Sequence, residues 1–245
     1  MYMKSTRFTL QAIVFCATIA EPALAEAPPQ IAVAGLYEWK EQIRPGGDWW
    51  GIFPDGNGYT LQPTRVRAIS DPDMVIPPEK PPRQIRVPDG NNGVIVFRGL
   101  MSAAAGPLNV VDLPPYPAPL QPGKSVVLML RSGPEKAAIR ITAEPDPAPP
   151  HPSGGTQRAA AGYQLVLQRG GEKPLKQVLY TRSQIKGEGP RLRWAGDLDR
   201  DGYVDLIYNF GEHHTETKLM LFLSSAAKEG EIVGLVAQWT GTCGC

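Results

Sequence analysis

The chain has 245 residues, of which 42% are hydrophobic, and its 25 basic residues nearly balance its 24 acidic residues. This length suffices for one large or two small domains with a hydrophobic core, and the balanced charge argues against a nucleic-acid-binding surface. The sequence contains no run of about 18 apolar residues, so we expect no transmembrane segment. Glycine and proline number 26 each, which favours a chain with many turns over a helical bundle.

The first 25 residues have the pattern of a bacterial secretory signal peptide. Lys4 and Arg7 precede the apolar run Phe8–Ala20, and Ala23-Leu24-Ala25 places small residues at positions −3 and −1 of a cleavage site. We therefore expect cleavage after Ala25 and a secreted or periplasmic protein. In that oxidising location Cys243 and Cys245 could form a disulfide with each other, bridge two chains, exchange thiols or bind a soft metal.

Short runs rich in Val, Ile, Leu and Tyr, separated by Gly, Pro, Asn and Asp, predict a mainly β protein with few or no long helices. Two strand pairs are expected to be hairpins because Asp-Gly and Asn-Gly turns separate them: 49–53 with 59–62, and 84–87 with 94–98. A third hairpin is expected to turn at 169–172. The other expected strands are 125–130, 137–142, 163–168, 175–180, 192–196, 204–210, 218–223 and 232–239.

A segment rich in proline and glycine at 146–157 suggests a linker between two regions. Such a segment favours extended polyproline conformations and cannot join a sheet. We therefore expect an N-terminal β region at 26–145 and a C-terminal β region at 158–245. The alternative is a single continuous sandwich.

The strongest chemical signal is the sequence GDLDRDGYVD at 196–205. Asp197, Asp199, Asp201 and Asp205 would occupy positions 1, 3, 5 and 9 of a cation-binding loop, and the carbonyl of Tyr203 would occupy position 7. Ca²⁺ takes six to eight oxygen ligands, and Gly202 permits the sharp turn that such a loop needs. The loop is not an EF-hand, because position 12 is Tyr208 instead of glutamate and the flanking segments are predicted strands.

The segment Trp194–Leu206 resembles the calcium loop of FG-GAP repeats, the VCBS-like repeats of the integrin-α type. In that family the loop joins two strands of a propeller blade, so the resemblance implies a sandwich-like or partial-propeller-like antiparallel fold. It also implies Ca²⁺ bound by Asp197, Asp199, Asp201, Asp205 and the Tyr203 carbonyl. Residues 221–225 further resemble small secreted bacterial proteins that carry one such loop.

These observations favour a non-catalytic binding or envelope-interaction module whose Ca²⁺ is structural and whose partner is an unidentified protein or glycan. A hydrolase acting on envelope polysaccharide or peptide is the main alternative. A third reading is a redox or metal-handling site that joins Cys243 and Cys245 to His213 and His214, which requires the C-terminal tail to lie beside residues 212–216. The pair Trp49-Trp50 near Tyr59 is expected to be core packing, with an exposed aromatic platform as the alternative.

Overall fold

The protein is built from sixteen β-strands in the part of the chain that the computed structural model describes, and no α-helix occurs there. The described residues are 28–56, 58–71, 81–88, 93–100, 104–114, 118–134, 138–145, 161–184, 189–211, 213 and 215–243. The expected signal peptide at 1–25 and the expected linker at 146–157 lie outside them. None of the described elements is a helix long and apolar enough to cross a membrane.

The strands form two antiparallel sheets, which confirms the prediction of a mainly β, sandwich-like fold. The larger sheet contains β1 (Gln30–Val33), β2 (Tyr37–Glu38), β3 (Gly46–Asp55), β4 (Gly58–Ser70), β5 (Arg83–Arg86), β6 (Ile95–Arg98), β7 (Gly106–Pro107), β8 (Asn109–Val110), β13 (Arg191–Asp197), β14 (Asp205–Asn209), β15 (Glu216–Leu223) and β16 (Gly234–Thr242). The smaller sheet contains β9 (Ser125–Leu128), β10 (Ile139–Pro145), β11 (Ala161–Arg169) and β12 (Leu175–Gln184).

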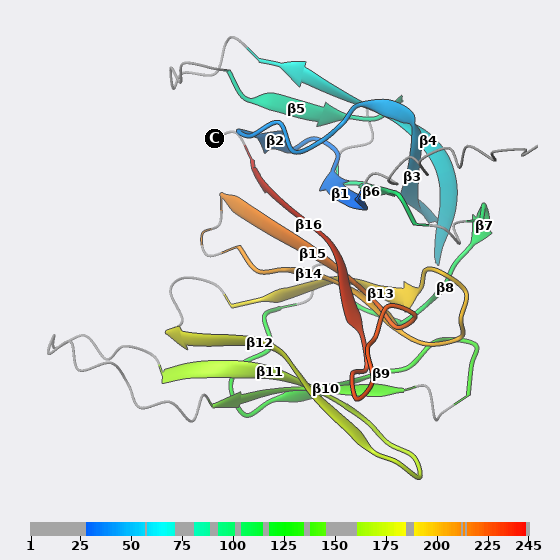
Figure 1. The fold of residues 1–245 in the computed structure, drawn as a ribbon, viewed down its shortest axis with the longest axis vertical. Helices are drawn as coiled ribbons and strands as arrows, with labels where there is room; N and C mark the ends of the chain where they lie inside the picture. The colour runs from blue at the N-terminus through cyan, green and yellow to red at the C-terminus, as the bar shows by residue number, and fades with distance from the viewer. Residues whose placement is uncertain are drawn as a thin grey trace, which may run out of the picture.

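Strands β13–β16 form a central layer with strands packed on both of its faces (Figure 1). The larger sheet has the order β1-β6-β3-β4-β5-β2-β16-β15-β14-β13-β8, and it curls so that β1 lies against β16. The first six strands therefore cover one face of the central layer. The smaller sheet covers the other face.

The central strands are apolar at successive positions because both of their faces are covered. On β14, Leu206 and Tyr208 belong to the core shared with the smaller sheet, whereas Ile207 belongs to the core shared with the first strands. Because successive side chains of a strand point to opposite faces, a strand covered on both faces is continuously apolar. The run Leu219–Leu223 on β15 has the same pattern and the same cause.

One of the predicted hairpins is wrong. The hairpins β3–β4 and β11–β12 form as expected, but the strands expected to pair at 84–87 and 94–98 do not pair with each other. Residues 34–36 run between them: Ala34 N–H donates to Val94 O at 2.9 Å, and Ile85 N–H donates to Leu36 O at 2.8 Å. A distant segment of chain thus replaces the local partner that the turn sequence suggested.

The expected linker does not coincide with a boundary between the two sheets. It falls between β10 and β11, which pair with each other from Ile139↔Arg169 to Pro145↔Tyr163. In the larger sheet, β2 from the N-terminal part pairs with β16 from the C-terminal part through Tyr37↔Thr242. Strands from both sides of residues 146–157 therefore contribute to both sheets.

Candidate metal site

The aspartate-rich loop connects two neighbouring strands of the central layer, as the flanking sequence predicted. It leaves β13 at Asp197 and enters β14 at Asp205, and the two strands pair through Gly196↔Asp205. Two residues of the loop have positive φ, Arg200 at 66° and Gly202 at 85°. Such a conformation is costly for a residue with a side chain, and glycine adopts it readily.

The side chain of Arg200 helps to hold its strained backbone conformation in place. Its guanidinium donates to the carbonyl of Ala104 at 2.9 Å and to that of Ala105 at 3.2 Å, on the segment that leads into β7. The strained loop residue is therefore tied to a segment nearly a hundred residues away in the sequence. Strain of this kind persists only where the surrounding structure holds it in place.

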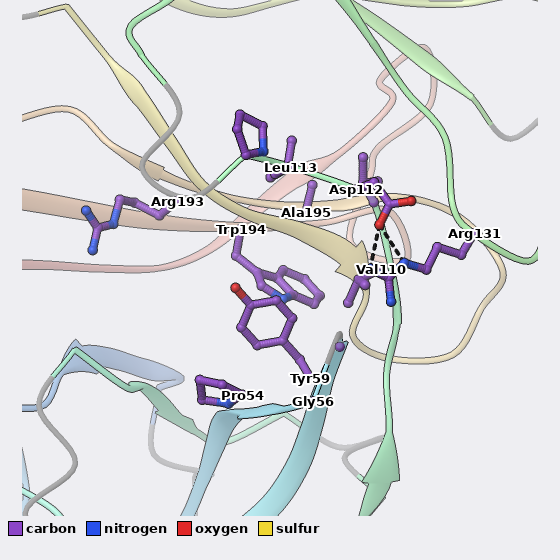
Figure 2. A pocket seen from close by; sticks show the side chains of 13 residues that line it. Pro54, Gly56, Tyr59, Val110, Asp112, Leu113, Arg131, Arg193, Trp194 and Ala195 are labelled. Atoms are coloured by element: carbon purple, nitrogen blue, oxygen red, sulfur yellow. Dashed lines mark hydrogen bonds and ion pairs between the residues drawn. The ribbon is translucent and has the colours of Figure 1, made fainter.

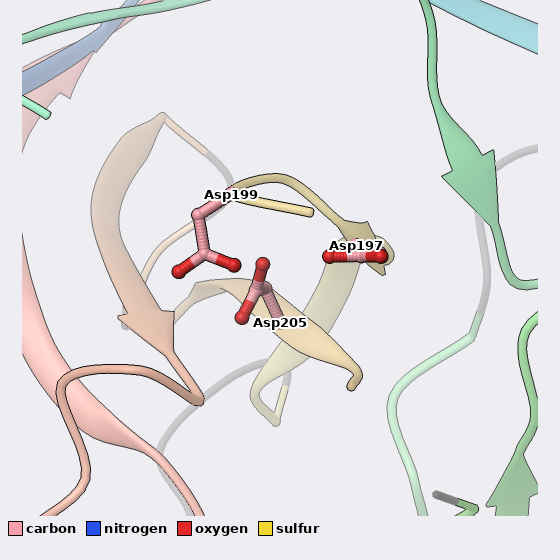
Figure 3. Close-up of side chains that lie close together, drawn as sticks. All are labelled: Asp197, Asp199 and Asp205. Atoms are coloured by element: carbon pink, nitrogen blue, oxygen red, sulfur yellow. The ribbon is translucent and has the colours of Figure 1, made fainter. Parts of the chain in front are cut away.

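The loop brings three carboxylates together, those of Asp197, Asp199 and Asp205 (Figure 3). One oxygen from each side chain lies within 4.8 Å of an oxygen of the other two. Ca²⁺ binds oxygen at about 2.3–2.6 Å, so two of its ligands can lie up to about 5 Å apart. The spacing of these three oxygens is therefore compatible with one shared calcium ion.

Two of the three carboxylates are buried, and one oxygen among them has no partner. Asp205 is 0% exposed, and it accepts hydrogen bonds from Leu198 N–H at 2.7 Å and Ser224 N–H at 2.8 Å. Asp197 is 7% exposed, and its Oδ2 accepts from Gly202 N–H at 3.1 Å. Its buried Oδ1 accepts no hydrogen bond from any of the described residues. Buried carboxylate oxygens are normally paired, so this atom requires an explanation.

The electrostatics of the loop disfavour three free negative charges. Burial raises the pKa of Asp205 well above its ordinary value, and the charge of Asp199 raises it further. Burial also raises the pKa of Asp197. The hydrogen bond from Gly202 N–H lowers this pKa in part, and the charges of Asp201 and Asp199 raise it. A divalent cation between these groups would remove both the repulsion and the cost of burial.

The remaining predicted ligands, Asp201 and Tyr203, lie in the same loop with different contacts. Asp201 accepts hydrogen bonds from Tyr203 N–H at 2.8 Å and from the Ser224 hydroxyl at 2.7 Å. The Tyr203 ring lies 5.1 Å from the Arg169 guanidinium of β11, a cation–π contact. The role of its carbonyl as a ligand stays a prediction.

Two residues that the loop spacing does not reveal complete the cluster. Ser224 Oγ lies 2.7 Å from Asp201 Oδ2 and 3.1 Å from Asp205 Oδ1, and Ser225 Oγ donates to Asp199. Both serines follow β15, which pairs with β14 through Leu206↔Phe222. Because a hydroxyl has one proton, Ser224 can donate to only one of its two carboxylates at a time.

The second predicted cluster, at the C-terminus, is described only in part. Cys243 is exposed, and its backbone N–H donates to Thr215 O at 3.1 Å, so the tail does lie beside the segment that contains His213. Cys245 and His214 lie outside the described residues. Within the described residues the aspartate loop is the one group of acidic, histidine or cysteine side chains close enough to hold a metal ion.

The tryptophan pair belongs largely to the core. Trp49 is fully buried, and its indole N–H donates to Arg44 O at 3.1 Å. Trp50 packs partly buried against the core of the first strands, while Tyr59 remains 38% exposed.

Comparisons with known proteins identify no relative, because the chain matches no protein-family model, no curated protein and no solved structure.

Proposed function

We propose that the protein is a secreted or periplasmic, non-catalytic binding or envelope-interaction module with one structural Ca²⁺ in the loop 197–205. One observation carries the cation assignment: Asp197 has a buried oxygen, Oδ1, without a partner, and its carboxylate lies close to those of Asp199 and Asp205. The signal-peptide pattern of residues 1–25 supports export. The resemblance of the loop to FG-GAP repeats supports calcium.

The choice of Ca²⁺ rests on the chemistry of the donors. Every candidate ligand is a hard oxygen atom. Soft metals are therefore disfavoured, because they prefer thiolate ligands. Two of the three carboxylates are buried, whereas Mg²⁺ requires stricter octahedral geometry and keeps several of its waters. Extracellular calcium sites of this kind bind with dissociation constants of about 10⁻⁴–10⁻³ M.

A structural role fits the position of the site better than a catalytic one. Asp205 is fully buried and, through Ser224, connects the start of β14 with the end of β15. The aspartates line neither the pocket beside Tyr59 nor the pocket beside His213. A buried cation here would hold three strands of the central layer together.

Thermal unfolding tests the calcium site. The purified protein, without its signal peptide, is melted in EDTA and then in about 2 mM Ca²⁺. With a dissociation constant of about 0.1 mM, linkage predicts about 1.8 kcal/mol of stabilisation, a rise in Tm of roughly 4–7 °C. The variant Asp199→Ala, which removes the least buried of the three carboxylates, should lose this rise.

Asp48→Asn is the matched control. Asp48 is an exposed aspartate that pairs with Arg98 on the first strands, so its variant should keep the full response to Ca²⁺. Equal melting temperatures of the wild type in EDTA and in Ca²⁺ would rule out the calcium site.

A further inference from the structure

A pocket of about 280 Å³ lies between the β3–β4 hairpin and strands β8 and β13 of the larger sheet (Figure 2). Tyr59 lines it from the hairpin, and Val110 lines it from β8. A backbone hydrogen bond joins these two walls, because Leu108 N–H, just before β8, donates to Tyr59 O at 2.9 Å. The shape of the pocket therefore depends on the position of the segment 104–108.

Hydrogen bonds contribute more than apolar packing to the attachment of this segment. Ala104, Ala105 and Pro107 are exposed, and Leu108 alone of the segment belongs to the core. The short strand β7 pairs with β4 over two residues. The guanidinium of Arg200 attaches the segment at its start, because it donates to the carbonyls of Ala104 and Ala105. A segment that buries so little apolar surface opens locally at a lower cost than the core strands.

Arg200 also determines the geometry of the calcium loop. It directly follows Asp199, and its φ of 66° sets the direction of the chain at that point. A change of this dihedral would move the Asp199 carboxylate relative to those of Asp197 and Asp205, with which it forms the cluster. The same residue therefore shapes the metal site and attaches the segment 104–108.

The charge of Arg200 does not neutralise the neighbouring aspartates. Although Arg200 stands between Asp199 and Asp201 in the sequence, it forms no ion pair with a described residue and donates to two neutral carbonyls instead. The carboxylates are thus left for another cation. Through space the guanidinium would repel Ca²⁺. Any contribution that Arg200 makes to Ca²⁺ binding must therefore come from the conformation that it holds.

We propose that Arg200 couples the calcium site to the segment 104–108, so that Ca²⁺ bound in the loop orders one wall of the pocket beside Tyr59. The cation holds the backbone of Arg200 through the loop, and the two carbonyls hold its guanidinium. Each of them favours the conformation that the other requires, and such a coupling is reciprocal. This inference rests on the proposed function, because it requires Ca²⁺ in the loop.

Calcium titrations of Arg200 variants test the effect of the anchor on the metal site. Isothermal titration calorimetry of the protein without its signal peptide measures the dissociation constant of Ca²⁺. Arg200→Ala should weaken binding about fivefold or more, because the strained φ loses its anchor. Arg200→Gly should bind Ca²⁺ more tightly than Arg200→Ala, because glycine adopts a positive φ without strain. Arg140→Ala, which removes an exposed arginine of β10, should keep the wild-type affinity.

Amide hydrogen exchange, measured with and without Ca²⁺, tests the effect of the cation on the segment. Leu108 N–H reports on opening of the segment, and the N–H of the fully buried Ile85, which donates to Leu36 O at 2.8 Å, reports on the stability of the whole fold. In the wild type Ca²⁺ should slow exchange at Leu108 by about the factor that Arg200→Ala costs in affinity. In Arg200→Gly, Ca²⁺ should still slow exchange at Ile85 but no longer at Leu108.

Two results would overturn the coupling alone: an Arg200→Ala protein that binds Ca²⁺ as tightly as the wild type, or equal slowing at Leu108 by Ca²⁺ in the wild type and in Arg200→Gly. A wild type that binds no Ca²⁺ in the calorimeter would overturn the calcium site, and this inference with it. The first titration therefore distinguishes the two failures. If Arg200→Ala does not fold, the exchange comparison between the wild type and Arg200→Gly decides the question.

Discussion

Asp197 and Asp205 place negative charge where the surrounding protein excludes water. Burial raises the pKa of both groups, so protonation and cation binding are two alternative ways of neutralising the same loop. The two should compete, and the pH should decide which of them stabilises the fold.

The stability of the metal-free protein should therefore fall as the pH rises. A carboxyl whose pKa is higher in the folded than in the unfolded state stabilises the fold fully below the unfolded value, near 4, and loses this contribution as the pH passes the folded value. We expect Tm in EDTA to decrease from about pH 5 toward neutrality more steeply than in Asp205→Asn. The increment from Ca²⁺ should grow over the same range, and an increment independent of pH would contradict this linkage.

The hydroxyl of Ser224 should matter most without the cation. It lies between the carboxylates of Asp201 and Asp205 and provides one of their few donors. Ser224→Ala should cost about 1.5–3 kcal/mol in EDTA, the range for hydrogen bonds to charged groups, and clearly less in Ca²⁺. Denaturant titrations under both conditions measure this, with the exposed Ser125→Ala as control. An equal loss in both conditions would mean that the hydroxyl does not substitute for a cation.

At the level of the elements, the connection between β15 and β16 positions the serines of the loop cluster. Gly234 opens β16, and a Cβ at this position would lie 2.0 Å from the carbonyl oxygen of Ala226. The close approach of these two backbone segments fixes the turn that follows Ser224 and Ser225. Only a residue without a side chain permits it.

Gly234→Ala should therefore lower the stability by about 1–3 kcal/mol or more, because the clash is with backbone and cannot be relieved by rotating a side chain. Gly170→Ala is the matched control, since a Cβ there meets no atom within 4 Å. Thermal melts of both variants test the pair. A Gly234→Ala protein as stable as the Gly170→Ala protein would contradict the packing argument.

The sequence predicts individual elements better than their partners. The alternation of residues locates most strands, and the spacing of the aspartates locates the loop, because both signals are local. The pairing of Ile85 with residues 34–36, and the approach of Ser224 to Asp205, depend on chain segments that meet only in the fold. The anchor from Arg200 to Ala104 is non-local in the same way.

For the whole molecule, the shared central layer makes the two sides of residues 146–157 interdependent. Trp194 and Leu219 face a core completed by the first strands, and Leu206 faces a core completed in part by β9 and β10. Removing the N-terminal half would expose one face of β13–β16 and part of the other to water. The hydrophobic effect then opposes a folded C-terminal fragment.

A chain cut by a protease at a site introduced within 146–157 should remain one folded particle. The two pieces should elute together in size-exclusion chromatography and melt in a single transition, because β10–β11 and β2–β16 still pair across the cut. The fragment 158–245 expressed alone should show no cooperative melt. Independent folding of that fragment would contradict the shared core.

The placement of β13–β16 also sets the order in which the native structure can be completed during synthesis. The four strands in the middle of the molecule come from the last part of the chain, residues 191–242. Both outer layers are synthesised before these strands and present apolar faces with nothing between them until residues 191–242 emerge. Long-range pairing of this kind slows folding and prolongs the exposure of unpaired strands. A chain truncated before β15 would therefore be a strong substrate for chaperones and proteases, even when its outer layers have already formed.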